Sequence, residues 1–498
     1  MRLSAGLFVF GLMLSGAARS QDISEADLRR HIEILASDEF EGREPGTAGE
    51  NKTVNYIATQ WSKAGFRPAG TDGSWYAPVT LTVRTPQSYR LALTDSNSHQ
   101  RVRVEQDDIV LRSRESSYHQ SAIPVVFVGY AEHGQYEPAV TGKLVLLPRK
   151  PRDDSGRVPD FRNRKAKLLQ DGAVGVITVL DDQDRWTRFQ RFFQRASTAL
   201  ADPENHAELE GVISFDQFQK LMRKSGQDPE RLLADRDELA VIELGLNAAA
   251  KAETQVRSYI SHNVIGKIPG TDPKSGALLF LGHWDHFGIC RSEDPLDPDK
   301  DRICNGAVDN ASGISLLIET AKRLSADQHD RDIFFLATTA EEKGLLGAEA
   351  FANHPPVPLQ TFKAVFNADT VALSGSGQEI AVVGMGRSSL DSDIALVAEE
   401  EGRDIDQSGK GNAYVKRQDG YVFLERGVPA YMITSAFADE ESLQAFLDGA
   451  YHDVTDEAND SLVLTGAAAD ANFHVALGNY FSSTTTYPGI ATSGSADN

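Results

Sequence analysis

Three apolar runs in the second half of the chain each lead into polar residues. The runs cover positions 277–281, 332–337 and 364–366. Apolar stretches without alternation are typical of strands buried on both faces, as in a parallel sheet covered by helices. Positions 312–324, 345–351 and 391–401 show helical spacing of apolar residues between or after these strands. From about 263 to 460 the pattern therefore predicts an α/β fold with a mostly parallel central sheet flanked by helices.

The first half of the chain shows a different order of predicted helices and strands. Ser24 followed by Asp27 is a helix-start pattern, and a second helix is expected around Val54 to Trp61, ending near Gly65. From 115 to 255, strands at 124–128, 143–147 and 174–179 are mixed with helices at 165–170 and 215–224, and 183–204 is expected to be a mobile loop or helix. We therefore predict a main domain over 21–114 and 256–482, a smaller inserted α/β domain over 115–255, and a disordered Ser-, Thr- and Gly-rich tail over 483–498.

The first twenty residues predict export. Arg2 precedes an apolar run from Leu3 to Leu14, which is too short to span a bilayer, and small residues around Ser20 suit cleavage before Gln21. We expect a secreted or periplasmic protein without membrane insertion of the mature chain. The formal net charge of -22 comes with no basic stretch, which argues against a nucleic-acid partner.

Cys290 and Cys304 are the only two cysteines of the chain. An oxidising compartment favours a disulfide between them, which would pin the loop in which both lie. Free thiols and metal ligation are the alternatives.

Metal-type side chains follow the three apolar runs in succession. In open α/β sheets, ligands bind at the carboxyl ends of the strands, so these side chains should lie together. The candidates are His283, Asp309, Glu341, Glu342, Asp369 and His452.

Two histidines, two aspartates and one glutamate give five ligands, so one carboxylate must bridge if each of two metals has three. Imidazole with carboxylate suits zinc. Three carboxylates and one hydroxide balance two divalent cations. Because Glu341 and Glu342 are adjacent, one can bind metal while the other reaches the attacking water as general base.

The motifs resemble those of the M28 zinc metallopeptidases, which include aminopeptidases and glutamate carboxypeptidase-like enzymes. The stretch from Leu35 to Thr47 resembles the start of secreted members, and the segment 115–255 resembles the protease-associated domain inserted in many of them. The motifs are Gly282-His283-Trp284-Asp285-His286, Gly306-Ala307-Val308-Asp309-Asn310-Ala311-Ser312-Gly313, Ala340-Glu341-Glu342-Lys343-Gly344-Leu345-Leu346-Gly347, Asn367-Ala368-Asp369 and Tyr451-His452.

The resemblance implies a role for each residue. Asp309 would bridge two Zn²⁺ ions, and Glu341 would be the general base that generates a metal-bridged hydroxide. Asp285 would orient His283 by accepting a hydrogen bond, whereas His286 is expected only to cap a helix or loop. Of the remaining ligands, Glu342 and His452 would bind one ion. His283 and Asp369 would bind the other.

The segment Arg417-Gln418-Asp419-Gly420-Tyr421 departs from the family pattern, in which a polar residue is usual where Gly420 stands. The group that polarises the substrate carbonyl or shapes the specificity pocket is therefore open. The candidates are Tyr414, Arg417 and Tyr421.

The leading hypothesis is an exported aminopeptidase that acts on peptides or proteins. A carboxypeptidase, or a glutaminyl-peptide cyclase with one zinc, would use a similar fold. A receptor-like relative without a metal site is a further alternative, but every ligand and the base are present here. For the inserted domain we expect a gating or binding role.

Overall fold

The computed structural model describes residues 22–129, 136–149, 161–180, 183–201, 208–234 and 241–489. The predicted signal segment and the end of the predicted tail, 490–498, lie outside these ranges. The chain forms two compact units, one made of the residues up to Pro78 and from His262 onward, and one of Val79–Ser261. Among the described residues, no helix combines the length and apolarity that a membrane span requires.

The first unit is built on a sheet in the order β16-β17-β15-β11-β14-β10. The central strand β11 pairs in parallel with β14 and β15, and β15 pairs in parallel with β17. β16 and β10 run antiparallel at the two sides. The prediction of an α/β fold with a mostly parallel sheet is confirmed. The strands are β11 Ala277–His283, β14 Asp332–Thr338, β15 Phe362–Asn367, β16 Ala381–Val383, β17 Ala430–Thr434, β10 Val241–Ile268, β1 Arg67–Pro68, and the hairpin β12 Gly288–Ile289 with β13 Ile303–Cys304.

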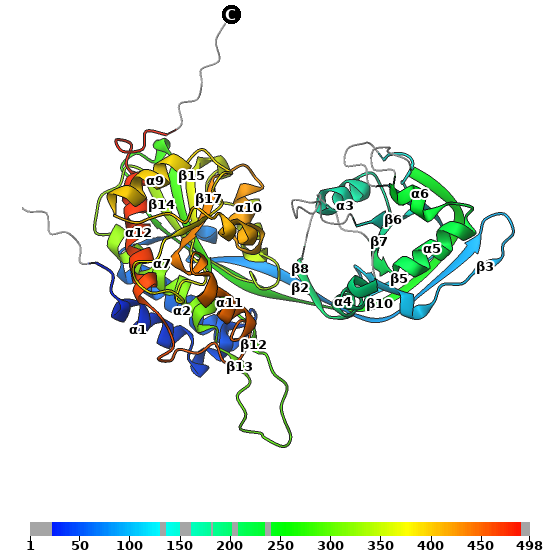
Figure 1. Cartoon of the computed structure of the whole chain (residues 1–498), viewed down its shortest axis with the longest axis horizontal. Helices are drawn as coiled ribbons and strands as arrows, with labels where there is room; N and C mark the ends of the chain where they lie inside the picture. Colours follow the sequence, from blue (N-terminus) through cyan, green and yellow to red (C-terminus); the bar gives the residue numbers. More distant parts are fainter. Residues whose placement is uncertain are drawn as a thin grey trace, which may run out of the picture. The chain divides into compact units, whose positions relative to one another are not determined.

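Helices cover both faces of this sheet (Figure 1). Alternate strand residues point to opposite faces, so Leu278 and Phe280 of β11 pack with α1, α2, α7 and α12, while Leu279 and Leu281 pack with α8 and α10. This explains why β11 contains no polar position before its end. The helices are α1 Glu25–Leu35, α2 Ala48–Lys63, α7 Gly313–Leu324, α8 Leu346–Asn353, α9 Asp391–Glu400, α10 Gly420–Leu424, α11 Glu440–Asp448 and α12 Thr465–Ser482.

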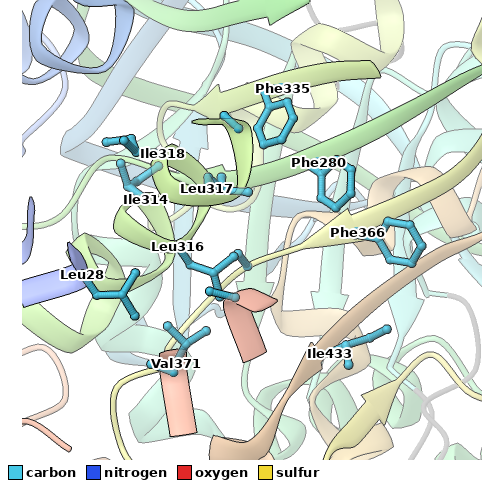
Figure 2. Close-up of a cluster of buried hydrophobic side chains, with 14 of the residues drawn as sticks. Leu28, Phe280, Ile314, Leu316, Leu317, Ile318, Phe335, Phe366, Val371 and Ile433 are labelled. Carbon is cyan, nitrogen blue, oxygen red and sulfur yellow. The ribbon is translucent and has the colours of Figure 1, made fainter. Parts of the chain in front are cut away.

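The larger core lies between the sheet and the α7 layer. Figure 2 shows Phe280, Phe335 and Phe366, from three adjacent strands, beside Leu316 and Leu317 of α7. The rings of Phe280 and Phe335 are stacked at 5.0 Å, and those of Phe280 and Phe366 lie at 5.3 Å. This packing holds the three strands in register, and their carboxyl ends therefore meet at one edge.

The second unit is larger than the predicted inserted domain. It begins at Val79 rather than near 115, because the long strand β2 pairs with β3 and β8 within this unit and β4 forms the edge of its sheet. The sheet order is β10-β5-β6-β7-β9-β4, with the middle strands parallel. Its elements are β2 Tyr76–Asp95, β3 Arg101–Val102, β4 Ile109–Ser113, β5 Ser117–Val128, β6 Leu144–Pro148, β7 Gly175–Val179, β8 Ser197–Leu200, β9 Leu209–Ile213, α3 Phe161–Gln170, α4 Gln183–Gln194, α5 Phe215–Lys224 and α6 Pro229–Ala234.

Two further expectations differ from the structure, the second only in part. The described part of the predicted disordered tail, 483–489, packs within the first unit: Tyr487 is buried against Phe481, and the backbone N–H of Thr484 donates to Asp330. For 183–204, where a mobile loop or helix was expected, the described residues form helix α4, which agrees with the second alternative, followed by strand β8, which was not expected. Both segments are polar in composition, but each contains an aromatic side chain that is buried, Tyr487 in the first and Trp186 in the second.

Candidate functional site

The ends of three adjacent parallel strands bring the predicted ligands together. His283 is the last residue of β11, and Asp369 comes two residues after β15. Glu341 and Glu342 follow β14. The last residue of β14, Thr338, is paired with His283 of β11. Tight turns point these side chains inward, since Ala340 before Glu341 and Thr370 after Asp369 both have a φ of 53°.

Asp309 and His452 come from loops over the same edge. Asp309 lies just before α7, and its backbone N–H, like that of Val308, donates to the carboxylate of Asp456 at 3.1 and 2.9 Å. His452 follows α11 with a φ of 59° and stacks on Tyr451 at 3.6 Å. Asp456 was not singled out from the sequence, and no motif marks it.

Asp309 lies between the two histidines. Its Oδ1 is 3.2 Å from Nε2 of His283, and its Oδ2 is 3.3 Å from Nε2 of His452. The Oδ1 of Asp369 is 3.6 Å from Nε2 of His283, and the Oε2 of Glu342 is 3.1 Å from Nε2 of His452. The five side chains therefore form two groups that share Asp309.

The electrostatics of the site favour bound cations. Burial alone would raise the pKa of Asp309, but the imidazoles of His283 and His452 beside it outweigh burial and hold this pKa well below its usual range. Burial raises the pKa of Glu341 well above its usual range. Burying this many carboxylates beside two imidazoles is costly unless further positive charge is present.

The residues fit zinc. Nitrogen and carboxylate oxygen donors are its usual ligands. The buried Nε2 of His452 faces two carboxylate oxygens and makes no hydrogen bond of good geometry with any described residue, as expected for a ligand atom. His283, Asp309 and Asp369 offer donor atoms within 4.8 Å of one another.

Asp285 contacts the site differently from the prediction. Nδ1 of His283 lies 3.1 Å from the backbone carbonyl oxygen of Asp285 but 3.9 Å from its carboxylate. The carboxylate instead accepts a hydrogen bond from the backbone N–H of Glu341 at 3.1 Å. Asp285 thus supports His283 through its main chain and the Glu341 turn through its side chain.

The expectation that His286 only caps a helix or loop is wrong. The ring is fully buried, and its Nδ1 lies 2.9 Å from Oε1 of Glu342. The charged partner follows a different strand, so no local pattern around His286 could reveal it.

Arg43 and Asn310 hold the ligand loops together. The buried guanidinium of Arg43 donates to the backbone carbonyl groups of Trp284 and Gly306, at 2.9 Å each, in the loops that carry His283 and Asp309. The side-chain amide of Asn310 donates to the carbonyl oxygens of His283 and Ala368 at 3.2 and 3.0 Å. Asn310 belongs to one of the motifs and Arg43 to the stretch from Leu35 to Thr47. The contacts of both side chains join segments that are distant in sequence, so only the fold shows them.

The disulfide between Cys290 and Cys304 is present. It closes the hairpin of β12 and β13, and the buried sulfur of Cys304 lies 3.6 Å from the carbonyl oxygen of His452. It therefore supports a ligand loop, as expected for a bridge in this segment.

A cleft opens beside the metal-type residues, lined by His283, Asp309, Glu341, Asp369, Thr370, Tyr414, Arg417, Gln418, Met432, Phe437, Leu443, Phe446, Leu447 and Tyr451. Of the predicted substrate-binding residues, Tyr414 and Arg417 line it. Tyr421 does not, because its hydroxyl donates to Glu425 one helical turn away, at 2.5 Å.

Comparison with known proteins agrees with the site. Residues 263–476, which contain every proposed ligand, match the family model of peptidase family M28. The predicted resemblance to the M28 zinc metallopeptidases is thereby confirmed.

Relatives of this chain include the vacuolar membrane protease of Candida glabrata, 25% identical over 255 residues, which are 47% of this chain and 24% of that protein. Aminopeptidase YwaD of Bacillus subtilis is 40% identical over 116 residues, 23% of this chain and 22% of that protein. The chain thus spans a quarter or less of the length of these curated relatives. In fold, the chain is similar to an aminopeptidase from Aneurinibacillus sp. strain AM-1, with a TM-score of 0.50 and 17% identity over 93% of this chain and 94% of that one.

Proposed function

We propose that this chain is an exported aminopeptidase that holds two zinc ions and removes N-terminal residues from peptides. The proposal rests on the position of the Asp309 carboxylate between two histidines. One of its oxygens lies 3.2 Å from Nε2 of His283, and the other lies 3.3 Å from Nε2 of His452. One further carboxylate, from Asp369 or Glu342, completes each side. Two sets of three ligands with a shared carboxylate are what a pair of closely spaced catalytic metals requires.

Zinc bound by these residues would polarise the substrate carbonyl and make a water molecule nucleophilic at neutral pH. Glu341 lines the cleft and is the general base of the proposed reaction. Its carboxylate takes a proton from the attacking water and gives it to the leaving amine. Asp285 holds Glu341 in place by accepting its backbone N–H.

The aminopeptidase direction is supported by the names of two similar proteins. Aminopeptidase YwaD shares 40% identity with part of this chain, and the similar Aneurinibacillus structure is that of an aminopeptidase. One wall of the cleft is apolar, which suits a substrate with an apolar side chain at the bond to be cut. This wall is made of Met432, Phe437, Leu443, Phe446 and Leu447.

A carboxypeptidase is the second candidate, because the cleft also contains a cation. Arg417 lines it, and its guanidinium donates to the hydroxyl of Tyr451 at 3.1 Å. A guanidinium in this place can pair with a C-terminal carboxylate of a peptide.

Aminoacyl-anilides and N-blocked peptides with a free carboxylate separate the two directions. The proposal expects hydrolysis of leucyl-anilide that is lost with a chelator and restored by Zn²⁺. Hydrolysis of the N-blocked peptides alone, reduced in Arg417→Ala, would establish the carboxypeptidase instead. A metal content of one zinc per chain would favour the cyclase reaction, and absence of chelator-sensitive hydrolysis of any peptide would refute the proposal.

Export and the second unit complete the proposal. The sequence of residues 1–20 supports cleavage near Ser20 and release outside the cytoplasm. The parallel strands and helices of the second unit support its assignment as a protease-associated domain with a gating or binding role. The N-terminal sequence of the protein purified from culture medium or periplasm would test the cleavage site.

A further inference from the structure

His286 makes a hydrogen bond that the proposed reaction does not use. Its Nδ1 lies 2.9 Å from Oε1 of Glu342. An ionised carboxylate only accepts hydrogen bonds, so Nδ1 carries the proton and donates it. The other oxygen of Glu342, Oε2, lies 3.1 Å from Nε2 of His452. The two oxygens of Glu342 therefore have separate partners, one outside the proposed metal centre and one within it.

The ring of His286 is confined on several sides. A Cβ on Gly306 would lie 2.7 Å from two atoms of the ring, so the imidazole packs directly on the backbone of the loop that carries Asp309. The ring of Phe287 lies at 5.1 Å and that of His452 at 5.8 Å, both edge-on. Because this buried ring has little room to turn, it offers Nδ1 to Glu342 in one direction.

We propose that His286 is a positioning residue for one of the two metal ions, the one held by Asp309, Glu342 and His452. It fixes the carboxylate of Glu342 so that Oε2 is directed at the ion. The inference rests on the proposed two-metal function. In the part of the chain that the structure describes, no hydrogen bond joins His286 to His283 or Asp369, so the ion on that side should be affected little.

Direct ligation by His286 is the competing explanation. Its donor atoms lie within 4.8 Å of those of Asp309 and Glu342, and its Nε2 makes no hydrogen bond with a described residue. However, Nδ1 is occupied by Glu342, and Nε2 lies across the ring and points away from Oε1. An ion bound to Nε2 of His286 would therefore lie on the side of the ring away from the Glu342 carboxylate. The geometry agrees better with a His286 that positions Glu342 than with a His286 that binds the ion.

The test compares metal binding in His286→Ala and His286→Asn. Metal-free protein is titrated with Zn²⁺ by calorimetry and with Co²⁺ by absorption spectroscopy. Loss of a hydrogen-bond partner of a metal ligand typically weakens metal affinity by about 10- to 100-fold. For His286→Ala we therefore expect one ion to bind as in the wild type and the second to bind about 10- to 100-fold more weakly. Asparagine keeps an N–H near the place of Nδ1 and should restore the second affinity to within a few-fold.

His474→Ala is the matched control, since His474 is also a fully buried histidine. Its Nδ1 hydrogen-bonds the backbone carbonyl oxygen of Asp470 at 2.8 Å, and no described hydrogen bond joins it to a proposed ligand. The control variant should lower thermal stability and leave both metal affinities unchanged. The inference is overturned if His286→Ala binds both ions normally, or if His474→Ala weakens the second ion equally. It is also overturned if His286→Asn fails to rescue and changes the Co²⁺ spectrum, because His286 would then be a ligand. A wild-type protein that does not bind two ions would instead refute the proposed function.

Discussion

Glu341 is the side chain on which turnover depends most in the proposed reaction. It faces the cleft, whereas its neighbour Glu342 contacts His286 and His452. Replacing Glu341 by glutamine keeps the shape but removes the base. We expect kcat to fall by about 10²- to 10⁴-fold, the usual contribution of a general base.

Metal content and KM should stay close to wild type in Glu341→Gln, since the ligands are untouched. Inductively coupled plasma analysis and steady-state kinetics provide the two measurements. Full activity of the variant would show that another group takes the proton. Loss of zinc together with activity would show that Glu341 is itself a ligand.

Arg43 supports the site through hydrogen bonds to main-chain carbonyl groups. Its guanidinium reaches the carbonyl groups of Trp284 and Gly306, as well as that of Leu35 at 2.8 Å. Lysine has fewer donors in a compact head and cannot serve all of these groups. At about 1.5–3 kcal/mol for each lost hydrogen bond to a charged group, Arg43→Lys should lower the free energy of unfolding by about 2–4 kcal/mol. It should also weaken zinc binding, because the loops of His283 and Asp309 separate.

Arg331→Lys is the matched control for Arg43→Lys. Arg331 is likewise buried and donates to the backbone carbonyls of Phe481, in the last turn of α12, and of Ser483, directly after it. Chemical denaturation should show a similar loss of stability in both variants, while zinc titration should show weaker binding only in Arg43→Lys. Equal zinc affinity in the two would contradict a specific function of Arg43 at the site.

At the scale of elements, a half-buried ion-pair cluster joins β4, β9 and α3 in the second unit. Glu210 of β9 lies 3.0 Å from Arg112, its paired residue on β4, and 2.6 Å from Lys165 of α3. Burial opposes the ionisation of Glu210, but the two cations outweigh it and lower its pKa to about 2 from an ordinary 4.5. The stabilisation is thus fully present above about pH 4.5 and is lost as the pH falls toward 2.

We expect Glu210→Gln to remove this acid-dependent part of the stability, which is at most about 3 kcal/mol for a shift of this size. Hydrogen exchange of the β4 and β9 amides between pH 4.5 and 2.5 measures it, after correction for the intrinsic exchange rate. Glu243→Gln removes the exposed partner of Lys143 and should change little. The same pH dependence in wild type and Glu210→Gln would contradict the assignment.

Helices and strands were predictable from the sequence where a single local pattern, such as a continuous apolar run or a capping box, determines them. β11 and β14 are buried on both faces, so their sequences are continuously apolar, and α1 has both halves of a capping box at Ser24 and Asp27. Helix α12 was not predicted, because it is buried around much of its circumference and its small residues, such as Ala467 and Gly478, show no polar face. The proposed ligands could be selected from the sequence because each follows a predicted strand or belongs to a motif. His286 and Asp456 were not, because their partners are distant in sequence.

At the scale of the whole molecule, the second unit is inserted between two neighbouring points of the first. The chain leaves the first unit after Pro78 and returns at His262, and the rings of Tyr76 and His262 lie 6.0 Å apart. The ligands, the base and the cleft-lining residues all belong to the first unit. Replacing Val79–Ser261 by a short Gly-Ser linker is therefore compatible with the backbone of the first unit.

We expect the shortened protein to bind zinc and to hydrolyse aminoacyl-anilides within about tenfold of the full chain, because no proposed catalytic group is removed. Its kcat/KM for long peptides should change more than that for dipeptide-sized substrates, since a gating or binding unit acts on chain that extends beyond the cleft. Circular dichroism and zinc content establish that the variant is folded, and a variant with a longer linker tests whether closure of the excised ends strains the sheet. If both folded variants lose anilide hydrolysis while retaining zinc, the second unit must contribute to the reaction itself. Equal changes for short and long substrates would refute the gating role.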